Sequence, residues 1–305
     1  CTSEQFETMN APVSIQPPAL PEGEYAWLET AFPERVVPVG DGAVVSVREC
    51  GTGLALVCLH GIGSGAASWL QTAALLAPAA RVIAWDAPGY GASTPLTMAA
   101  PRATDYAQRL CRMLDALQID RCVLVGHSLG ALVAAAAAYP GQESARRIDR
   151  LVLISPARGY GAPERLVQSG QVRAERLAAL ADLGVAGMAL KRSARLLSDG
   201  ASERAREWVR WNMGRLHDGG YRQAIELLCG DDLLAYLPPA MPVRVACGAL
   251  DVVTTPVACA EVARACGVAL ESIADAGHAC YVEQPAAVAA WLRNEIRNIQ
   301  SKLQI

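Results

Sequence analysis

The sequence predicts an α/β protein with a mostly parallel eight-stranded sheet covered by helices and a helical cap inserted after the sixth strand. Two observations lead to this fold class. Short apolar segments, which we interpret as strands, alternate with helical segments along most of the chain. The last six of these eight strand segments follow the pattern of a parallel sheet. These strand-like segments stop between residues 157 and 239, where Ala, Leu, Arg and Glu dominate. The expected strands are 36–40, 43–49, 54–60, 81–86, 121–127, 149–155, 243–248 and 269–274.

These patterns divide the chain into three parts. Residues 1–34 are polar and rich in proline, which predicts a mobile N-terminal arm. Residues 35–156 and 240–305 should form the α/β core, and residues 157–239 a cap that arches over the strand ends and lines the substrate pocket. The first residues lack the basic start and apolar centre of a signal peptide. We therefore expect the native start at Met9 or upstream of Cys1.

The composition excludes several classes of function. The 305 residues include 27 basic and 30 acidic side chains, and neither sign forms a long block. We therefore expect no nucleic acid or membrane as a partner, but a small-molecule substrate, with a homodimer as the assembly to consider. The ten cysteines form no paired metal motif, and Cys58, Cys122 and Cys247 fall within predicted strands. We therefore expect the cysteines to be buried free thiols of a cytoplasmic protein.

The most informative segment is Gly126-His127-Ser128-Leu129-Gly130, which joins an apolar strand to an Ala-rich helix. Glycines on either side of a serine relieve crowding where a strand turns sharply into a helix. This context is typical of a nucleophile elbow, in which the serine hydroxyl projects from the turn. Ser128 is therefore the candidate nucleophile.

A serine nucleophile needs a histidine to take its proton and an acid to orient that histidine. Of the four histidines, His278 stands just after a predicted strand and before the last helix. Asp251 directly follows the strand 243–248, and strand ends are where such groups gather. Asp275 is the competing acid, but a turn is its expected role. The order Ser128, Asp251, His278 is the order of the α/β-hydrolase triad.

The reaction also needs hydrogen-bond donors for the negative charge that develops on the attacked oxygen. The strand 54–60 ends in a glycine-rich loop that begins with His60 and Gly61. The expected donors are the backbone N–H groups of Ile62 and Leu129. We expect His60 to brace this loop rather than to transfer protons.

Taken together, these residues resemble the α/β-hydrolase fold family, in particular its capped, cofactor-independent serine hydrolases. The resemblance spans about residues 40–298, in the family's order and spacing. It implies that no cofactor or metal is needed and that Asp86 has a structural role in a turn. The matching segments are His60-Gly61-Ile62-Gly63, Asp86-Ala-Pro-Gly89-Tyr-Gly91-Ala-Ser93, Gly126-His127-Ser128-Leu129-Gly130, and Gly277-His278 with Glu283-Gln-Pro285.

Specificity should lie in the cap, where the candidate pocket residues are Trp208, Trp211 and Met213. The segment 157–239 contains twelve Lys and Arg against ten Asp and Glu, which is compatible with an anionic substrate. An arginine that faced the pocket could hold a carboxylate through two hydrogen bonds. Arg210 is the one we select, because its position resembles the carboxylate-binding cap arginine of the meta-cleavage-product hydrolases.

The resemblance to that subfamily is partial, and the enol-lactone hydrolases of aromatic catabolism resemble the chain about as well. They share Gly-His-Ser and the Glu-Gln-Pro after the histidine. The chain departs from the meta-cleavage-product hydrolases at the residue before the serine, in the oxyanion loop and after the histidine, where it has His127, Gly63-Ser64-Gly65 and Ala279.

The main prediction is a serine esterase that cleaves small carboxylic esters or lactones through an acyl-enzyme, with Ser128 as nucleophile, His278 as base and Asp251 as acid. The alternative is a carbon–carbon or enol-lactone hydrolase of aromatic catabolism that acts on a dienoate or a lactone. The same fold also hosts lyases, transferases and ligand-binding proteins. A serine-reactive phosphonate would separate these from a serine hydrolase.

Overall fold

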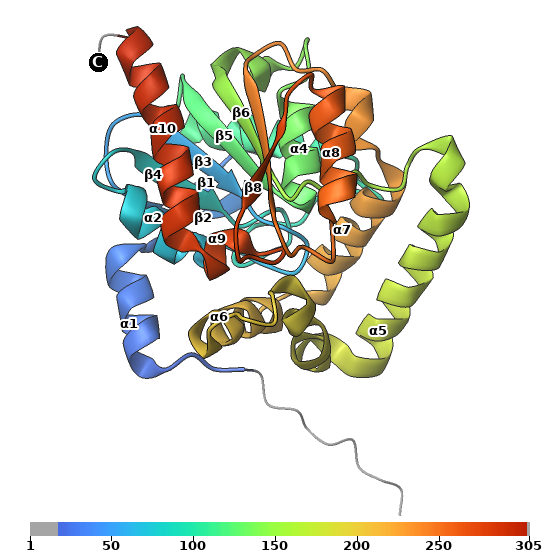
Figure 1. Ribbon diagram of the computed structural model, residues 1–305. Coiled ribbons are helices and arrows are strands. Elements are labelled where there is room, and N and C mark those ends of the chain that lie inside the picture. Colours follow the sequence, from blue (N-terminus) through green and yellow to red (C-terminus); the bar gives the residue numbers. More distant parts are fainter. Residues whose placement is uncertain (1–17, 304–305) are drawn as a thin grey trace, which may run out of the picture.

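A single sheet forms the centre of the molecule. The computed structural model of the protein describes residues 18–303 (Figure 1). The strands pair in the order β1-β2-β4-β3-β5-β6-β7-β8. β2 is antiparallel to its neighbours β1 and β4, whereas the six strands from β3 to β8 are parallel, as predicted. The strands are β1 (Glu34–Pro38), β2 (Val44–Cys50), β3 (Ala55–Leu59), β4 (Arg81–Trp85), β5 (Cys122–His127), β6 (Ile148–Ile154), β7 (Val243–Gly248) and β8 (Leu270–Ile273).

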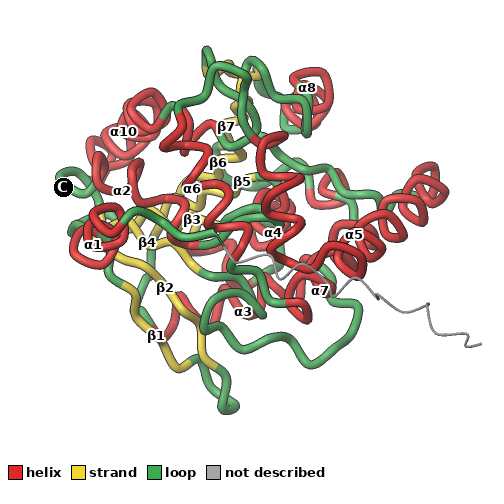
Figure 2. Tube along the Cα trace, turned by 90° about the horizontal axis from the view of Figure 1, so that it is seen from below, coloured by secondary structure: helices red, strands yellow, loops and turns green. Residues whose placement is uncertain are grey.

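Helices cover both faces of the sheet. Outside the segment between β6 and β7 they are α1 (Glu22–Ala31), α2 (Leu70–Leu76), α3 (Ala103–Ala116), α4 (Leu129–Ala137), α8 (Pro256–Ala265), α9 (Cys280–Glu283) and α10 (Pro285–Leu303), with the short 3₁₀ helices η1 (Ala66–Trp69) and η2 (Glu143–Arg147). Figure 2 shows α2 and α10 on one side of the strands and α4 on the other. Successive side chains of a strand point to opposite faces of the sheet. In β3, Leu56 therefore packs with residues of α2 and α10, and Val57 packs with residues of α4.

The segment between β6 and β7 is helical, which confirms the predicted insertion point of the cap. We use the name cap for residues 157–239. Its long helix leaves helical geometry at Gly184, where φ is 59° and ψ is −179°. The cap contains η3 (Pro163–Arg165), α5 (Leu166–Arg192), η4 (Ser193–Leu196), α6 (Glu203–Gly214), α7 (Asp218–Gly230) and η5 (Leu233–Tyr236).

The predicted N-terminal arm over 1–34 needs a correction. The first part of it, residues 1–17 with Met9, lies outside the described residues. The rest is not an irregular arm, because it contains α1, and the side chains of Leu28 and Phe32 are fully buried against the core. These two residues lie four apart and so share one face of the chain as it leaves the helix. One buried pair within a polar segment is too weak a pattern to predict a packed helix.

Two predictions from composition can be compared with the described part of the chain. Its nine cysteines are all free thiols, and Cys58, Cys122 and Cys247 are buried in strands, as expected. Between residues 18 and 303, no helix combines the length and the apolar character needed to cross a bilayer.

Candidate active site

Ser128 lies on the sharp turn between β5 and α4. Its backbone has φ 53° and ψ −116°, a left-handed conformation that is strained for a residue with a side chain. A Cβ atom at Gly126 would lie 2.4 Å from the carbonyl oxygen of Gly130, and one at Gly130 would lie 2.4 Å from that of Leu59. Only glycine fits at either position, which accounts for both glycines of the motif. The turn places Ser128 on the wall of a cavity.

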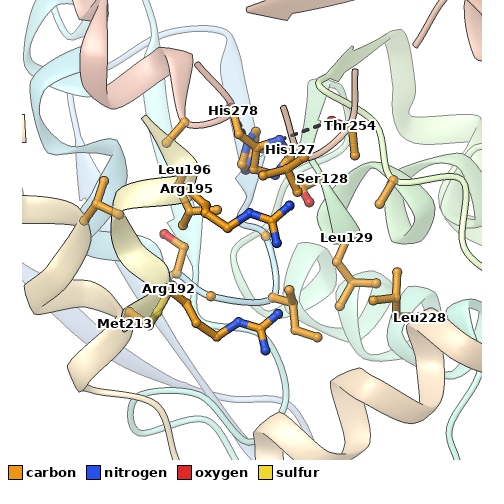
Figure 3. A pocket seen from close by; sticks show the side chains of 18 of the residues that line it. His127, Ser128, Leu129, Arg192, Arg195, Leu196, Met213, Leu228, Thr254 and His278 are labelled. Carbon is orange, nitrogen blue, oxygen red and sulfur yellow. Dashed lines mark hydrogen bonds between the residues drawn. The ribbon is translucent and has the colours of Figure 1, made fainter. Parts of the chain in front are cut away.

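His278 and Asp251 form a buried pair that reaches the same cavity. Nδ1 of His278 lies 2.8 Å from Oδ2 of Asp251, and His278 lines the cavity together with Ser128 (Figure 3). The backbone N–H groups of Val253 and Thr254 donate to the other carboxylate oxygen at 2.7 and 3.0 Å. The ends of β7 and β8, which are adjacent and parallel, bring the acid and the histidine together.

These contacts keep the Asp251 carboxylate ionised. Burial alone would raise the pKa of Asp251, but the hydrogen bond and charge of His278 and the backbone donors lower that pKa to about 2. The ionised carboxylate accepts a hydrogen bond from the Nδ1–H group of the imidazole. Nε2 of His278 is then the nitrogen that can take a proton from a neighbouring hydroxyl.

Thr254 is a site residue that sequence reasoning missed. Its hydroxyl lies 3.0 Å from Oδ2 of Asp251, 2.9 Å from the carbonyl oxygen of Ser155 and 3.1 Å from Nδ1 of His278. The Thr254 hydroxyl therefore contacts both the carboxylate and the imidazole and helps to hold them in place. The available signal was a threonine three residues after the acid, a spacing at which its backbone N–H and hydroxyl can both reach the carboxylate.

Asp275, the competing acid, is held elsewhere. It is exposed and has a φ of 52°, which is the conformation of a turn residue. Its carbonyl oxygen accepts a hydrogen bond from the side chain of Gln284 at 3.0 Å. Asp275 thus has the turn position expected for it, and Asp251 is the aspartate that contacts His278.

The loop after β3 lies directly over Ser128. A Cβ atom at Gly61 would lie 3.0 Å from Cβ of Ser128, and both Ile62 and Leu129 line the cavity. Within residues 18–303, neither of the two candidate backbone donors, Ile62 or Leu129, gives its N–H to a backbone oxygen in a turn or loop. The prediction that these two amides donate to an oxygen in the cavity is compatible with this arrangement.

Side chains beneath this loop hold its shape. Nε2 of His60 accepts the N–H of Ala87 at 3.0 Å, so Nδ1 carries the proton and donates to the Gly61 carbonyl oxygen at 2.8 Å. The hydroxyl of Tyr90 donates to the carbonyl oxygen of Ile62 at 2.9 Å. Asp86 accepts the N–H of Ala66 at 2.8 Å. His60 thus braces the loop as expected, and Asp86, for which a structural role in a turn was expected, also contacts the end of this loop.

His127 links the turn at Ser128 to the loop that carries His278. Its Nε2 donates to the carbonyl oxygen of His278 at 2.9 Å, and its ring packs between those of His278 and Tyr281. Burial, followed by the neighbouring His278, lowers the pKa of His127 to about 3. His127 is therefore neutral at ordinary pH and acts as a fixed hydrogen-bond donor.

A seam of hydrogen bonds joins the cap to the loop that carries His278. The Glu283 carboxylate accepts the backbone N–H groups of Gly277 and Ser198 at 2.9 and 3.1 Å, and the Ser198 hydroxyl as well. The N–H of Ala279 donates to the carbonyl oxygen of Leu196 at 2.7 Å. This seam fixes the end of η4 beside the histidine, and it gives a physical role to the glutamate of the Glu-Gln-Pro segment.

We expect Glu283→Ala to lower the free energy of unfolding by about 1–3 kcal/mol, because two partly buried N–H groups would lose their acceptor. Glu283→Gln retains one carbonyl oxygen for these donors and should recover most of that loss. Urea denaturation of the two variants tests the expectation. Equal losses for alanine and glutamine would show that the seam does not depend on these hydrogen bonds.

The cavity has a volume of about 250 Å³ and lies between the strand ends and the cap. Of the four cap residues predicted to bind substrate, Met213 lines it, whereas Arg210, Trp208 and Trp211 do not. The reason is the helical repeat: Met213 and Val209 lie four apart and share the face of α6 that lines the cavity.

The other three residues lie on different faces of the helix. The indole of Trp208 donates to Glu24 of α1 at 2.9 Å. The ring of Trp211 packs against Tyr25 and lies under the Arg215 guanidinium. Nε of Arg210 is buried without a hydrogen-bond partner in the described part of the chain. We therefore correct the prediction that these residues form the pocket.

Three other cap arginines line the cavity instead. They are Arg176 and Arg192 of α5 and Arg195 of η4, and Figure 3 shows the side chains of Arg192 and Arg195 pointing into the cavity. The sequence did signal an excess of basic residues in the cap, but not which of them face inward. The spacing of Arg192 and Arg195, three residues apart, was the local sign that the two share a side of the chain.

Comparison with known proteins places these features in context. A sequence model of the alpha/beta hydrolase family matches residues 56–291. The 2-hydroxy-6-oxononadienedioate/2-hydroxy-6-oxononatrienedioate hydrolase of Burkholderia vietnamiensis is 37% identical over 148 residues, which cover 46% of this chain and 49% of that protein. The 2-hydroxy-6-oxo-6-phenylhexa-2,4-dienoate hydrolase of Burkholderia cepacia is 34% identical over 122 residues, 39% and 41% of the two chains. The chain thus matches less than half the length of each relative.

Solved structures resemble the chain over most of its length. A thermophilic esterase from Thermogutta terrifontis aligns with a TM-score of 0.72 and 22% identity over 87% of this chain and 98% of its own. The enol-lactonase from Burkholderia xenovorans LB400 aligns with a TM-score of 0.71 and 24% identity over 85% and 98%. At these identities the likeness shows a shared fold.

Proposed function

Because this chain belongs to the alpha/beta hydrolase family, we propose that it is a serine hydrolase that cleaves small carboxylic esters or lactones. The observation that carries the proposal is the 2.8 Å contact between His278 and Asp251 at a cavity that also holds Ser128, whose backbone is strained. Strain of this kind is found where a side chain must be held in one position for reaction.

In the proposed reaction the Ser128 hydroxyl oxygen attacks the substrate carbonyl carbon while its proton moves to Nε2 of His278. The N–H groups of Ile62 and Leu129 donate to the oxygen that becomes negative. His278 then gives the proton to the leaving alcohol, and the acyl group stays on Ser128. Water attacks this ester, again with His278 as base, and the carboxylic acid leaves.

The direct test is covalent labelling. A fluorophosphonate is expected to add to the Ser128 peptide of the wild-type protein in a time-dependent way, which mass spectrometry detects as a defined mass increase. An excess of an ester that the protein hydrolyses should slow the labelling. The Ser128→Ala variant should not be labelled. Labelling at another serine, or an ester turnover that survives in Ser128→Ala, would overturn the proposal.

The second candidate is carbon–carbon or enol-lactone hydrolysis, which is favoured by the dienoate hydrolases among the relatives. In the carbon–carbon reaction, the bond between a ketone carbon and its neighbour breaks. The hydroxyl group of water goes to the ketone carbon, which becomes a carboxylic acid, and a proton goes to the neighbouring carbon. Arg210 no longer supports this candidate, since it does not line the cavity. Loss of the visible absorbance of a 2-hydroxy-6-oxo dienoate, without turnover of simple esters, would move the assignment to this candidate.

A further inference from the structure

The charge of the cavity wall is unusual for a site that binds a neutral ester. Three guanidinium groups, those of Arg176, Arg192 and Arg195, line it, together with the single carboxylate of Glu175. At neutral pH this leaves a net charge of +2 around about 250 Å³. No other acidic side chain lines the cavity in the described part of the chain.

Several other arginines of the cap are neutralised by carboxylates. Arg158 pairs with Asp232, and Arg173, only three residues before Arg176, pairs with Glu226 at 3.0 Å. Within residues 18–303, by contrast, Arg176, Arg192 and Arg195 form no ion pair. The one side-chain partner that they have there is the hydroxyl of Tyr221, which accepts from Arg176 at 3.1 Å.

Holding three cations close together with one carboxylate beside them, that of Glu175, costs free energy. Arg192 is partly buried, and burial, followed by the charges of Arg176 and Arg195, lowers its pKa. The chain nevertheless brings arginines from both sides of the break at Gly184 to the same cavity. An anion in the cavity would remove this repulsion, and guanidinium groups bind carboxylates and phosphates through paired hydrogen bonds.

We propose that the substrate carries two negative charges in addition to its scissile carbonyl, and that Arg176, Arg192 and Arg195 of the cap bind them. This inference rests on the proposed function and specifies its substrate class. A dianion matches the net charge of +2 on the wall, whereas a neutral ester would leave that charge uncompensated. The guanidinium groups would also orient the substrate, with its charged end in the cap and its carbonyl at Ser128.

The test is a series of methyl esters that differ in charge but share the leaving group. Methyl butanoate is neutral, monomethyl glutarate has one carboxylate, and a terminal monomethyl ester of propane-1,2,3-tricarboxylate has two. We expect kcat/KM to increase in this order, by about tenfold or more for each charge. Arg192→Gln and Arg195→Gln should each lower the ratio of kcat/KM for the dianionic ester to that for the neutral ester by about 10- to 100-fold, mainly through KM.

Arg173→Gln is the matched control, because Arg173 lies on the same helix but pairs with Glu226 and does not line the cavity. It should leave the ratio unchanged. A neutral ester that is hydrolysed as well as the dianionic one, or an equal effect of Arg173→Gln and Arg192→Gln, would overturn the inference. The proposed function would still hold in that case if ester turnover depends on Ser128.

A binding measurement separates failure of the inference from failure of the proposed function. Calorimetric titration of Ser128→Ala with glutarate, glycerol 3-phosphate and butyrate needs no turnover. Binding of either dianion at least tenfold tighter than butyrate, weakened by Arg192→Gln, supports the inference, and the tighter dianion tells whether the natural charge is carboxylate or phosphate. Equal binding of all three compounds, or no binding, would contradict it.

Discussion

Asp251→Asn is expected to lower kcat for the best ester by on the order of 10⁴, whereas Asp275→Asn should leave it within about twofold of wild type. Oδ2 of Asp251 accepts a hydrogen bond from the Nδ1–H group of His278, with a distance of 2.8 Å between the nitrogen and the oxygen. An amide nitrogen at that position would donate instead, which favours the tautomer with its proton on Nε2. That nitrogen could no longer take the proton of Ser128.

The two aspartates make a matched pair of variants. Asp251 is close to His278 in space, and Asp275 is close to it in the sequence. Asp275 is only three residues away along the chain, but it is exposed in a turn and does not contact the imidazole. Steady-state kinetics of both variants, with circular dichroism to verify folding, measures the difference. A large loss in Asp275→Asn with little change in Asp251→Asn would reverse the assignment of the acid.

The core of the site could be predicted because local rules determine it. A serine between two glycines, after a strand and before a helix, permits few backbone geometries, and the structure contains the expected sharp turn at Ser128. The acid and the histidine follow adjacent parallel strands, so their proximity follows from the order of β7 and β8 in the sheet.

The cap could not be predicted to the same depth, because its helices are packed by contacts that no short pattern encodes. Arg210 and Val209 are neighbours in sequence, yet successive residues of a helix point about 100° apart, and only Val209 lines the cavity. A rotation of α6 by one residue would have exchanged them. The rotation is set by contacts far away in sequence, such as that between Trp208 and Glu24.

The same limit explains why Arg192 and Arg195 were not selected from the sequence. Twelve basic residues in the cap are too many to rank by composition, because composition does not tell which of them pair with carboxylates. What distinguishes these two arginines, together with Arg176, is the absence of an ion pair within residues 18–303 combined with a place on the cavity wall. Both properties exist only in three dimensions.

Gly130→Ala is expected to destabilise the protein by about 3 kcal/mol, at the upper end for overpacking. The new Cβ atom would lie 2.4 Å from the Leu59 carbonyl oxygen and 2.7 Å from that of His60. Both obstacles are backbone atoms at the end of β3, so no side-chain rotation can relieve the overlap. The helix α4 would have to move away from the strand, and Leu129 would move with it.

Gly170→Ala provides the control, because the same substitution there should have the opposite sign. Gly170 lies inside α5, and nothing lies within 4 Å of its ideal Cβ position. Alanine in a helix is favoured over glycine by about 0.5–1 kcal/mol, so this variant should be more stable than wild type. Urea denaturation followed by tryptophan fluorescence measures both variants. A stable Gly130→Ala would mean that α4 can shift without cost, and the amide of Leu129 could then not be held in one position for catalysis.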